Sequence, residues 1–356
     1  MEDDVSDRLA ERGAAWLARR DDLVPLGTKP VGEQRRLRGL PGPVVSLEAD
    51  EHRAVTIRRV RVAVTGGAGF IGSNLVDALV ERGDEVVAID SLAGGKREQV
   101  NAKAEFVERD VREGLDLEGV EVVFHLAAQT DVQTSLARPA EDADVNVVGT
   151  VLVAEAAQRA GARIVFTSTG GAIYGECDGP ASEGSPRRPL SPYGIGKLCA
   201  EEYLAGWNRI HGTTHVVARL ANVYGPRQSS SLEGGVVAVF LDRMARGEPT
   251  VIFGDGLQTR DFIYVGDVVE GLLAAAASVS GTVFNVGTGR ETTVLELHAA
   301  CAQAAGSEAR AGLEPARLGD LSRSVLDVSL VEAELGFRAR TPLADGVART
   351  WAWTVR

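Results

Sequence analysis

The feature that most constrains this sequence is a glycine-rich turn between a β-branched run and an apolar helical pattern. The run Val60–Thr65 is followed by Gly66, Gly69 and Gly72. Glycine allows the tight turn, lets a pyrophosphate approach the backbone and lets the helix pack close to the strand. A second strand-like run ends at Asp90, about 20 residues on, where an acid bonds a ribose 2′-hydroxyl. These residues predict a dinucleotide-binding unit, and because Asp90 would repel a 2′-phosphate, they favour NAD over NADP.

Apolar runs typical of strands alternate with amphipathic helical patterns from residue 59 onward. Such an alternation predicts a parallel sheet covered by helices on both faces, which is a Rossmann-like, doubly wound α/β fold. Ligands of these folds bind beyond the carboxyl ends of the strands. The predicted strands are Val60–Thr65, Glu85–Asp90, Glu105–Val111, Val120–Leu126, Ala162–Ser168 and His215–Leu220, and the main predicted helices follow Gly72, begin after Pro139 and cover residues 192–207.

The chain divides into three predicted parts. Residues 1–58 precede the first core strand and form an extension of unknown role, which is either partly disordered, an overlong start, or an arm that packs on a partner subunit. Residues 59–229 form the NAD-binding Rossmann domain. Residues 230–356 have shorter elements and predict a smaller C-terminal α/β region that binds substrate, partly interleaved with the Rossmann domain.

Composition excludes several classes of function. The net charge is -12 and no block of Lys and Arg stands apart from acids, so a nucleic acid is not expected as a partner. The three cysteines, Cys177, Cys199 and Cys301, are far apart and odd in number, so we expect no metal site and a reducing, cytoplasmic setting. No apolar run approaches the roughly 18 residues of a membrane span, and the first residues do not read as a targeting signal.

The pair Tyr193 and Lys197 carries the predicted chemistry. At this spacing both side chains lie on one face of a helix. A lysine ammonium beside a phenol, with the positive nicotinamide of NAD nearby, lowers the pKa of the tyrosine, which then works as a general base or acid on a substrate hydroxyl. The same spacing often arises by chance on a surface helix. Its occurrence downstream of a nicotinamide fingerprint favours the catalytic interpretation.

A hydroxyl at the end of the strand 162–168 is the third catalytic candidate. Both Ser168 and Thr169 could hydrogen-bond the substrate oxygen and hold it between the tyrosine and the nicotinamide. The structural alternative is that they satisfy backbone groups at the strand end. We favour Thr169.

The chain resembles the NAD-dependent epimerase/dehydratase family, which consists of extended short-chain dehydrogenase/reductases, and within it the UDP-glucose 4-epimerase type. The resemblance covers residues 59–356 in unbroken order. The motifs that carry it are Thr65-Gly-Gly-Ala-Gly-Phe-Ile-Gly72, His125-Leu-Ala-Ala-Gln129, Asp144-Val-Asn-Val-Val-Gly-Thr150, Thr167-Ser-Thr169, Ser191-Pro-Tyr193-Gly-Ile-Gly-Lys197, Arg219-Leu-Ala-Asn-Val-Tyr-Gly-Pro-Arg-Gln228 and Gly254-Asp-Gly-Leu-Gln-Thr-Arg260-Asp-Phe262.

The resemblance implies roles for particular residues. In the family, the glycine turn binds pyrophosphate, the acid after the second strand binds the adenosine ribose, and the third strand end binds adenine. The implied cofactor-binding residues are Gly66, Gly69, Phe70, Ile71, Gly72, Asp90, Asp110, Val111, Ala127, Ala128, Gln129, Tyr193 and Lys197. The implied nucleotide-sugar contacts are Asn222 and Arg260 on the diphosphate, Arg317 and Asp320 on phosphate and uridine ribose, and Val236, Val237 and Phe253 around the uracil.

The implied reaction is a redox-neutral inversion at C4 of a UDP-hexose, of the UDP-glucose/UDP-galactose type. Relatives that eliminate water or carbon dioxide carry acids just after the hydroxyl residue, whereas residues 170–173 here contain none. Ser324 stands where the family often has a tyrosine, and a small residue there would leave room for an N-acetyl group. The alternatives are a UDP-glucuronate 4-epimerase, another dehydratase or decarboxylase of the family, or a non-catalytic NAD-binding scaffold. The family also implies a homodimer through helices around 140–160 and 192–207.

Overall fold

The computed structural model describes residues 59–230, 235–308, 310–316 and 321–356. The predicted extension 1–58 lies outside the described residues, so its proposed roles stay predictions. The domain boundary near residue 230 also stays a prediction. In the part of the chain that is described, no helix is both long and apolar enough to cross a membrane.

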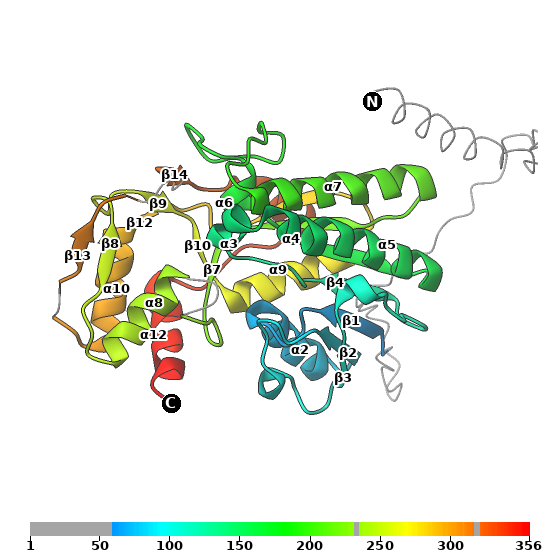
Figure 1. Ribbon diagram of the computed structural model, residues 1–356, viewed down its shortest axis with the longest axis horizontal. Coiled ribbons are helices and arrows are strands. Elements are labelled where there is room, and N and C mark those ends of the chain that lie inside the picture. The colour runs from blue at the N-terminus through cyan, green and yellow to red at the C-terminus, as the bar shows by residue number, and fades with distance from the viewer. Residues whose placement is uncertain (1–58, 231–234, 309, 317–320) are drawn as a thin grey trace, which may run out of the picture. The chain divides into compact units, whose positions relative to one another are not determined.

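A parallel sheet forms the centre of the fold, as predicted, and it has seven strands (Figure 1). Six of them correspond to the predicted strands, whereas the seventh, β11, comes from the predicted substrate-binding region. The strand order of the sheet is β11-β6-β5-β4-β1-β2-β3. The strands β1 to β3 are therefore added toward one edge and β4 to β6 toward the other, and the order changes side between β1 and β4. The strands are β1 (Arg61–Thr65), β2 (Glu85–Asp90), β3 (Glu105–Glu108), β4 (Val122–His125), β5 (Arg163–Thr169), β6 (Val216–Leu220) and β11 (Val283–Val286).

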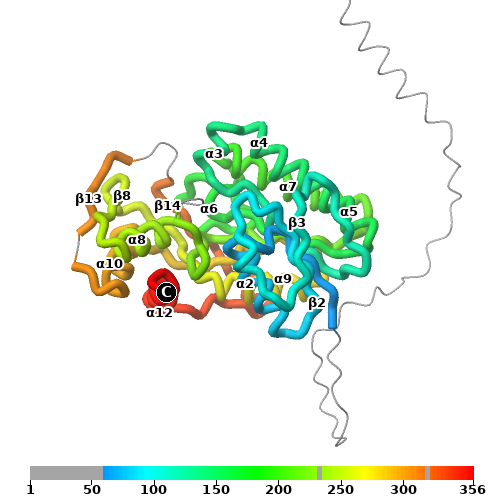
Figure 2. The backbone as a smooth tube through the Cα atoms, turned by 60° about the horizontal axis from the view of Figure 1, so that its bottom comes forward, coloured from blue at the N-terminus to red at the C-terminus, as the bar shows by residue number. Residues whose placement is uncertain are grey.

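Helices cover both faces of this sheet because its strands are apolar on both sides. Along β1, Val62 and Val64 pack in the core beneath α2 and α9, whereas Ala63 packs in the core beneath α5 and α7. Figures 1 and 2 show α5 beside α7 and α2 beside α9. The helices and short 3-10 or π segments of this part are α2 (Phe70–Arg82), η1 (Arg97–Gln99), η2 (Val111–Glu113), α3 (Val132–Ala137), α4 (Pro139–Ala143), η3 (Asp144–Val148), α5 (Gly149–Ala160), α6 (Gly170–Ile173), α7 (Pro192–His211) and α9 (Val265–Ala277).

A separate apolar cluster forms around Phe240, Leu297 and Val347, where α8, α10 and α12 pack on one another (Figure 2). Three small sheets accompany it, with strand orders β10-β7, β12-β9-β14 and β13-β8. The elements are β7 (Asn222–Tyr224), α8 (Val236–Ala245), β8 (Val251–Phe253), β9 (Thr259–Arg260), β10 (Phe262–Tyr264), β12 (Thr292–Thr293), α10 (Val294–Ala305), β13 (Gly312–Glu314), β14 (Arg323–Ser324), α11 (Ser329–Leu335) and α12 (Leu343–Thr354).

Helix α7, which carries Tyr193 and Lys197, begins at Pro192 as predicted but continues to His211, beyond the predicted end at residue 207. The Ser191 hydroxyl accepts a hydrogen bond from the backbone N–H of Gly194, and Pro192 occupies the first helical turn, where its missing N–H costs nothing. Gly212 ends the helix in the left-handed conformation. These caps fix the first and last residues of α7, and with them the positions of Tyr193 and Lys197 on the helix.

Candidate functional site

The glycine turn between β1 and α2 has the backbone geometry that the sequence predicted. Gly66 has a φ of +71°, and a Cβ there would lie 2.8 Å from the backbone nitrogen of Ala127. A Cβ at Gly72 would overlap the carbonyl oxygen of Gly66. No side chain caps the N-terminus of α2 and no acid stands in its first turn. The glycines thus let the turn pack closely on its own backbone and on Ala127, and the backbone N–H groups at the start of α2 have no side-chain cap, which suits an anion.

Asp90 lies beside this turn at the carboxyl end of β2. One of its carboxylate oxygens accepts a hydrogen bond from Ala68 N–H at 3.0 Å and the other accepts one from Leu92 N–H at 2.8 Å. The backbone of the glycine turn therefore fixes the orientation of the acid. Each oxygen keeps a lone pair for a ribose hydroxyl.

The third strand end places Asp110 and Val111 together. Asp110 caps η2 and accepts hydrogen bonds from the Arg112 side chain, which also reaches Asp144 at 2.8 Å. The hydrogen bond from Arg112 lowers the pKa of the Asp110 carboxyl below its usual range. Val111 is buried next to it.

Gln129, after β4, is held by a network of amides. Its backbone N–H donates to Asn146 Oδ1 at 3.0 Å, and its side-chain amide donates to Asp142 Oδ1 at 2.8 Å. Asn146 in turn donates to the Gln129 carbonyl oxygen and to the same Asp142 oxygen. The preceding Ala127 donates its N–H to Thr65 Oγ1, which ties this segment to the end of β1.

Lys197 is buried, with a relative exposure of 3%, and lies at the sheet end near β5. Its ammonium donates to the Thr167 carbonyl oxygen at 3.1 Å and stands 4.8 Å from the centroid of the Phe166 ring. Burial lowers the pKa of Lys197 to about 8, while Asp142 and Glu201 act in the opposite direction. Tyr193 is half-buried one turn earlier on the same helix.

A chain of contacts links this lysine to the glycine turn across three neighbouring strands. The Thr167 hydroxyl donates to the His125 carbonyl oxygen, and His125 Nδ1 lies 2.7 Å from the hydroxyl of Thr65, which directly precedes Gly66. Burial, with a further contribution from Lys197, lowers the pKa of His125 to about 3, so its ring is neutral. The predicted catalytic helix and the predicted nucleotide turn are therefore brought to one end of the sheet.

The two candidate hydroxyls at the end of β5 have different surroundings. Thr169 caps α6 by accepting a hydrogen bond from Ala172 N–H at 3.2 Å, which leaves its own O–H able to donate. The hydroxyl of Ser168 is buried and has no hydrogen-bond partner among the described residues. Both hydroxyls therefore retain a donor.

The predicted substrate contacts begin at Asn222 in β7. Its backbone N–H donates to the Asp261 carbonyl oxygen at 2.8 Å, and its buried side-chain oxygen makes no hydrogen bond within the ranges that the structure describes. Gly171 faces this amide, since a Cβ there would lie 3.3 Å from Asn222 Oδ1. The amide thus lies next to α6, directly after the two candidate hydroxyls.

Arg260 in β9 pairs in parallel register with Ser324 in β14, and its guanidinium donates to the Thr259 carbonyl oxygen. Phe253 ends β8, and Val236 and Val237 begin α8. Val237 is buried in the apolar cluster of α8, α10 and α12, whereas Val236 lies at the edge of that cluster. Arg317 and Asp320 lie outside the described residues.

The sequence pattern did not indicate the buried acids Asp142 and Glu201, whose charges act on Lys197. Asp142 lies on α4 and carried no motif signal, because only its tertiary contacts to Gln129 and Asn146 distinguish it from a surface acid. Glu201 follows Lys197 by four residues on the same helix, a spacing that could have indicated it. Its partner Arg219 comes from β6.

These features together define a class of protein. A Rossmann-like parallel sheet with a glycine turn, an acid after the second strand and a buried lysine in a Tyr-x-x-x-Lys helix defines a nicotinamide-dependent enzyme of the short-chain dehydrogenase/reductase type.

Comparison with known proteins narrows this class. Residues 62–287 match the sequence pattern of the NAD dependent epimerase/dehydratase family. The UDP-glucose 4-epimerase of Mycolicibacterium smegmatis is 45% identical over 82% of this chain and 97% of its own length. A solved UDP-glucose 4-epimerase of Thermotoga maritima, with UDP-glucose, is 42% identical and superposes with a TM-score of 0.81 over 83% of this chain and 98% of its own. That of Thermus thermophilus, in complex with NAD, is 41% identical with a TM-score of 0.77 over 83% and 99%.

The chain therefore belongs to the NAD-dependent epimerase/dehydratase family, and the family resemblance, the fold class and the NAD cofactor predicted from the sequence are confirmed.

Proposed function

We propose that this protein is an NAD-dependent UDP-hexose 4-epimerase that interconverts UDP-glucose and UDP-galactose. The observation that carries the proposal is the buried Lys197 ammonium, four residues after Tyr193, linked through Thr167 and His125 to the strand that leads into the glycine turn. The α6 segment Gly170–Ile173 offers no acid for an elimination, which favours epimerisation over dehydration.

The cofactor would be held by residues whose geometry fits it. The uncapped start of α2 suits the pyrophosphate, the Asp90 carboxylate suits the adenosine ribose, and Asp110 with Val111 lies at the next strand end for adenine. Gln129, fixed by its amide network, would line the nicotinamide side. We assign cofactor binding to Gly66, Gly69, Phe70, Ile71, Gly72, Asp90, Asp110, Val111, Ala127, Ala128, Gln129, Tyr193 and Lys197.

In the proposed mechanism Tyr193 takes the proton of the sugar 4-hydroxyl and later returns it. When bound, NAD would supply the two-electron oxidation of the C4 alcohol as a hydride acceptor and would return the hydride, so that C4 is inverted without net redox change. The Lys197 ammonium stabilises the phenolate form of Tyr193 by its charge. A hydroxyl from the end of β5 would hold the same sugar oxygen, and we keep Thr169 as the first candidate and Ser168 as the second. Thr169→Val and Ser168→Ala are compared by kcat, and because Thr169 also caps α6, a fall in Thr169→Val counts for catalysis only where the unfolding free energy and NAD binding are retained.

The nucleotide must stay anchored while the oxidised sugar turns over. Asn222 and Arg260 would bind the diphosphate, Arg317 and Asp320 the phosphate and uridine ribose, and Val236, Val237 and Phe253 the uracil. One observation supports this division: Arg260 is half-buried, and a guanidinium is suited to a diphosphate. Asn222 would donate its side-chain amide N–H to the same group. When most of the binding energy comes from the nucleotide, the hexose is held loosely. The oxidised sugar can then rotate and present its opposite face to the cofactor.

Ser324 sets the proposed tolerance for larger sugars. It is small and pairs directly with Arg260 on β9. A serine at this position supports acceptance of UDP-N-acetylglucosamine as well as UDP-glucose. Ser324→Tyr should remove turnover of the N-acetylated sugar and keep that of UDP-glucose.

A substrate panel tests the proposed function. Purified protein is incubated with UDP-glucose, UDP-N-acetylglucosamine, UDP-glucuronate and a dTDP-hexose without added NAD, and products are followed by NMR. Inversion at C4 of UDP-glucose without added cofactor supports a closed redox cycle. A double bond or released carbon dioxide would instead indicate the dehydratase or decarboxylase alternative, and a protein that binds NAD without turning over any sugar would be a scaffold.

We also propose a cytoplasmic homodimer. Ile195, Cys199 and Tyr203 are exposed at four-residue spacing along α7, and Val148 is exposed on η3. Such an apolar stripe supports pairing with the same helices of a second copy. Light scattering of the wild type against Ile195→Glu tests the assembly, and fractionation of expressing cells tests the location.

A further inference from the structure

The acids near Lys197 differ in how well they can stabilise its buried ammonium. Asp142 on α4 and Glu201 on the lysine's own helix are the acids whose charges act on the ammonium, although neither forms a direct salt bridge with it, and His125 from β4 is neutral. The packing elements β5 and η3 bring Thr167, Ser168 and Asn146, which are uncharged, and Asp144 on η3 pairs with Arg112. Apart from the phenol of Tyr193 one turn earlier on α7, Asp142 and Glu201 are therefore the two acids of the described elements that can balance the buried charge.

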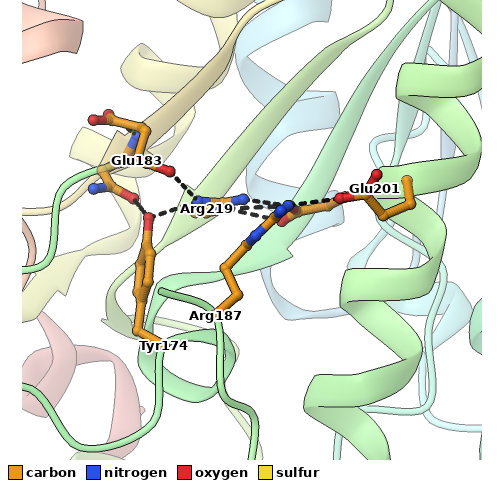
Figure 3. A network of polar contacts seen from close by, with 7 residues as sticks. Tyr174, Glu183, Arg187, Glu201 and Arg219 are labelled. Atoms are coloured by element: carbon orange, nitrogen blue, oxygen red, sulfur yellow. Dashed lines mark hydrogen bonds and ion pairs between the residues drawn. The ribbon is translucent and has the colours of Figure 1, made fainter. Parts of the chain in front are cut away.

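Glu201 is already committed to another cation. Its carboxylate accepts hydrogen bonds from Arg219 Nε at 3.0 Å and from Nη2 at 2.6 Å, and both side chains are almost fully buried. Figure 3 shows Arg219 between Glu201 and Tyr174, whose hydroxyl accepts a further hydrogen bond from the guanidinium. Because Arg219 balances Glu201, this pair contributes little net charge at Lys197.

Asp142 accepts no hydrogen bond from a cationic side chain among the described residues. Its relative exposure is 1%, and its Oδ1 accepts hydrogen bonds from two neutral amides, Gln129 at 2.8 Å and Asn146 at 3.0 Å. Its Oδ2 is buried and accepts no hydrogen bond from any residue in the described ranges. This oxygen faces α7 directly before Lys197, since a Cβ at Gly196 would lie 3.2 Å from it.

A buried carboxylate with one unused oxygen is costly unless a positive charge lies close by. The same is true of the buried ammonium, so attraction between the two charges across the α4–α7 contact would lower the cost of burying both without a direct salt bridge. We propose that Asp142 is a positioning residue whose carboxylate is the counter-ion of the Lys197 ammonium and whose other oxygen fixes the Gln129 amide. It would hold the catalytic lysine charged and orient the segment predicted to line the nicotinamide. The catalytic meaning rests on the proposed function, whereas the ion pairing can be measured independently of it.

The sequence offers a direct measurement, because the chain has only four lysines, Lys29, Lys96, Lys103 and Lys197. Full-length protein labelled with ¹³C at the lysine ε-carbon is titrated by NMR, and the Lys197 signal is assigned by its loss in Lys197→Met. We expect the Lys197 midpoint to fall by about one pH unit in Asp142→Asn, which keeps an oxygen for the two amides and removes the charge. The matched control is Glu141→Gln, the neighbouring exposed acid on α4, which should leave the midpoint unchanged.

An unchanged Lys197 midpoint in Asp142→Asn overturns the proposal, as does an equal fall in Glu141→Gln. If Asp142→Asn does not fold, aspartyl ¹³Cγ titration of Lys197→Met tests the pair from the other side. Loss of the ammonium should raise the midpoint of one aspartyl carboxyl relative to the wild type, and no such rise refutes the pairing.

The activity profile connects the pair to catalysis. The high-pH limb of kcat for UDP-glucose epimerisation should move to lower pH in Asp142→Asn and stay in place in Glu141→Gln. If the protein has no epimerase activity but Asp142→Asn still lowers the Lys197 midpoint, the charge interaction between Asp142 and Lys197 is supported and the proposed function is rejected. An active epimerase in which Asp142→Asn changes neither the Lys197 midpoint nor the high-pH limb of kcat would support the proposed function and reject the role of Asp142.

Discussion

The buried ion pair of Arg219 and Glu201 gives the sharpest prediction about stability. Arg219 is 2% exposed and Glu201 3%, so neither charge has access to water. The carboxylate accepts three hydrogen bonds from the guanidinium, at 3.0, 3.2 and 2.6 Å. Removing one partner of such a pair leaves the other charge buried without compensation, which costs about 3–5 kcal/mol.

The perturbation is Glu201→Gln, which keeps the size of the side chain and one acceptor oxygen. We therefore expect a loss near the lower end of that range, about 3 kcal/mol of unfolding free energy. Equilibrium urea denaturation measures it. The neighbouring Glu202→Gln is the matched control, because Glu202 pairs with Arg187 at an exposed site where a salt bridge contributes about 0–1 kcal/mol.

A double substitution completes the test. Arg219→Met combined with Glu201→Leu removes both buried charges, and the protein should then recover most of the stability lost in Glu201→Gln. A loss below about 1 kcal/mol for Glu201→Gln would refute the reasoning, because the carboxylate would then not be needed to compensate the guanidinium.

Three further predictions concern the turn, the base and the pH dependence. Gly72→Ala should abolish NAD binding in calorimetry and destabilise the fold by about 1–3 kcal/mol because its Cβ would overlap the Gly66 carbonyl oxygen, whereas Gly94→Ala, which meets no atom, should do neither. Tyr193→Phe should lower kcat by about 10²–10⁴-fold while the protein still binds NAD through the other assigned residues, and full turnover would exclude Tyr193 as the base. Lys197 has a folded-state pKa of about 8, below its unfolded value of 10.5, so between these pH values the unfolded chain binds the proton and the folded chain does not. The free energy of unfolding should therefore rise with pH in this range by up to about 1.4 kcal/mol per unit. A rise that persists unchanged in Lys197→Met would contradict this.

The sheet and the nucleotide turn were predictable because their signals are local. The strand β1, the glycines after it and Asp90 lie within a short stretch whose pattern already requires a strand, a turn and a helix. The start of α7 was equally clear, because Ser191 and Pro192 are typical of a helix N-terminus. Tyr193 and Lys197 then followed from helical spacing alone.

The remaining features depend on contacts between distant segments. The predicted helix after Pro139 contains a π segment, η3, which no residue pattern announced, and Asn146 within it reaches the backbone of Gln129. Thr169 caps α6 because the helix begins at Gly170. A helix that began one residue earlier would be capped by Ser168 instead, and the sequence does not distinguish these two starts. The pairing of Glu201 with Arg219 joins a helix to a strand, so spacing could not reveal it.

The seventh strand has a consequence for how this chain can be cut. β11 and α9 come from the C-terminal half, yet β11 completes the main sheet beside β6 and α9 covers its apolar face. A fragment ending near residue 230 would expose the backbone edge of β6 together with Val216 and Ala218, an arrangement that invites association with other chains. The cofactor-binding half should therefore aggregate when expressed alone, and regain solubility when the complementary half is co-expressed with it.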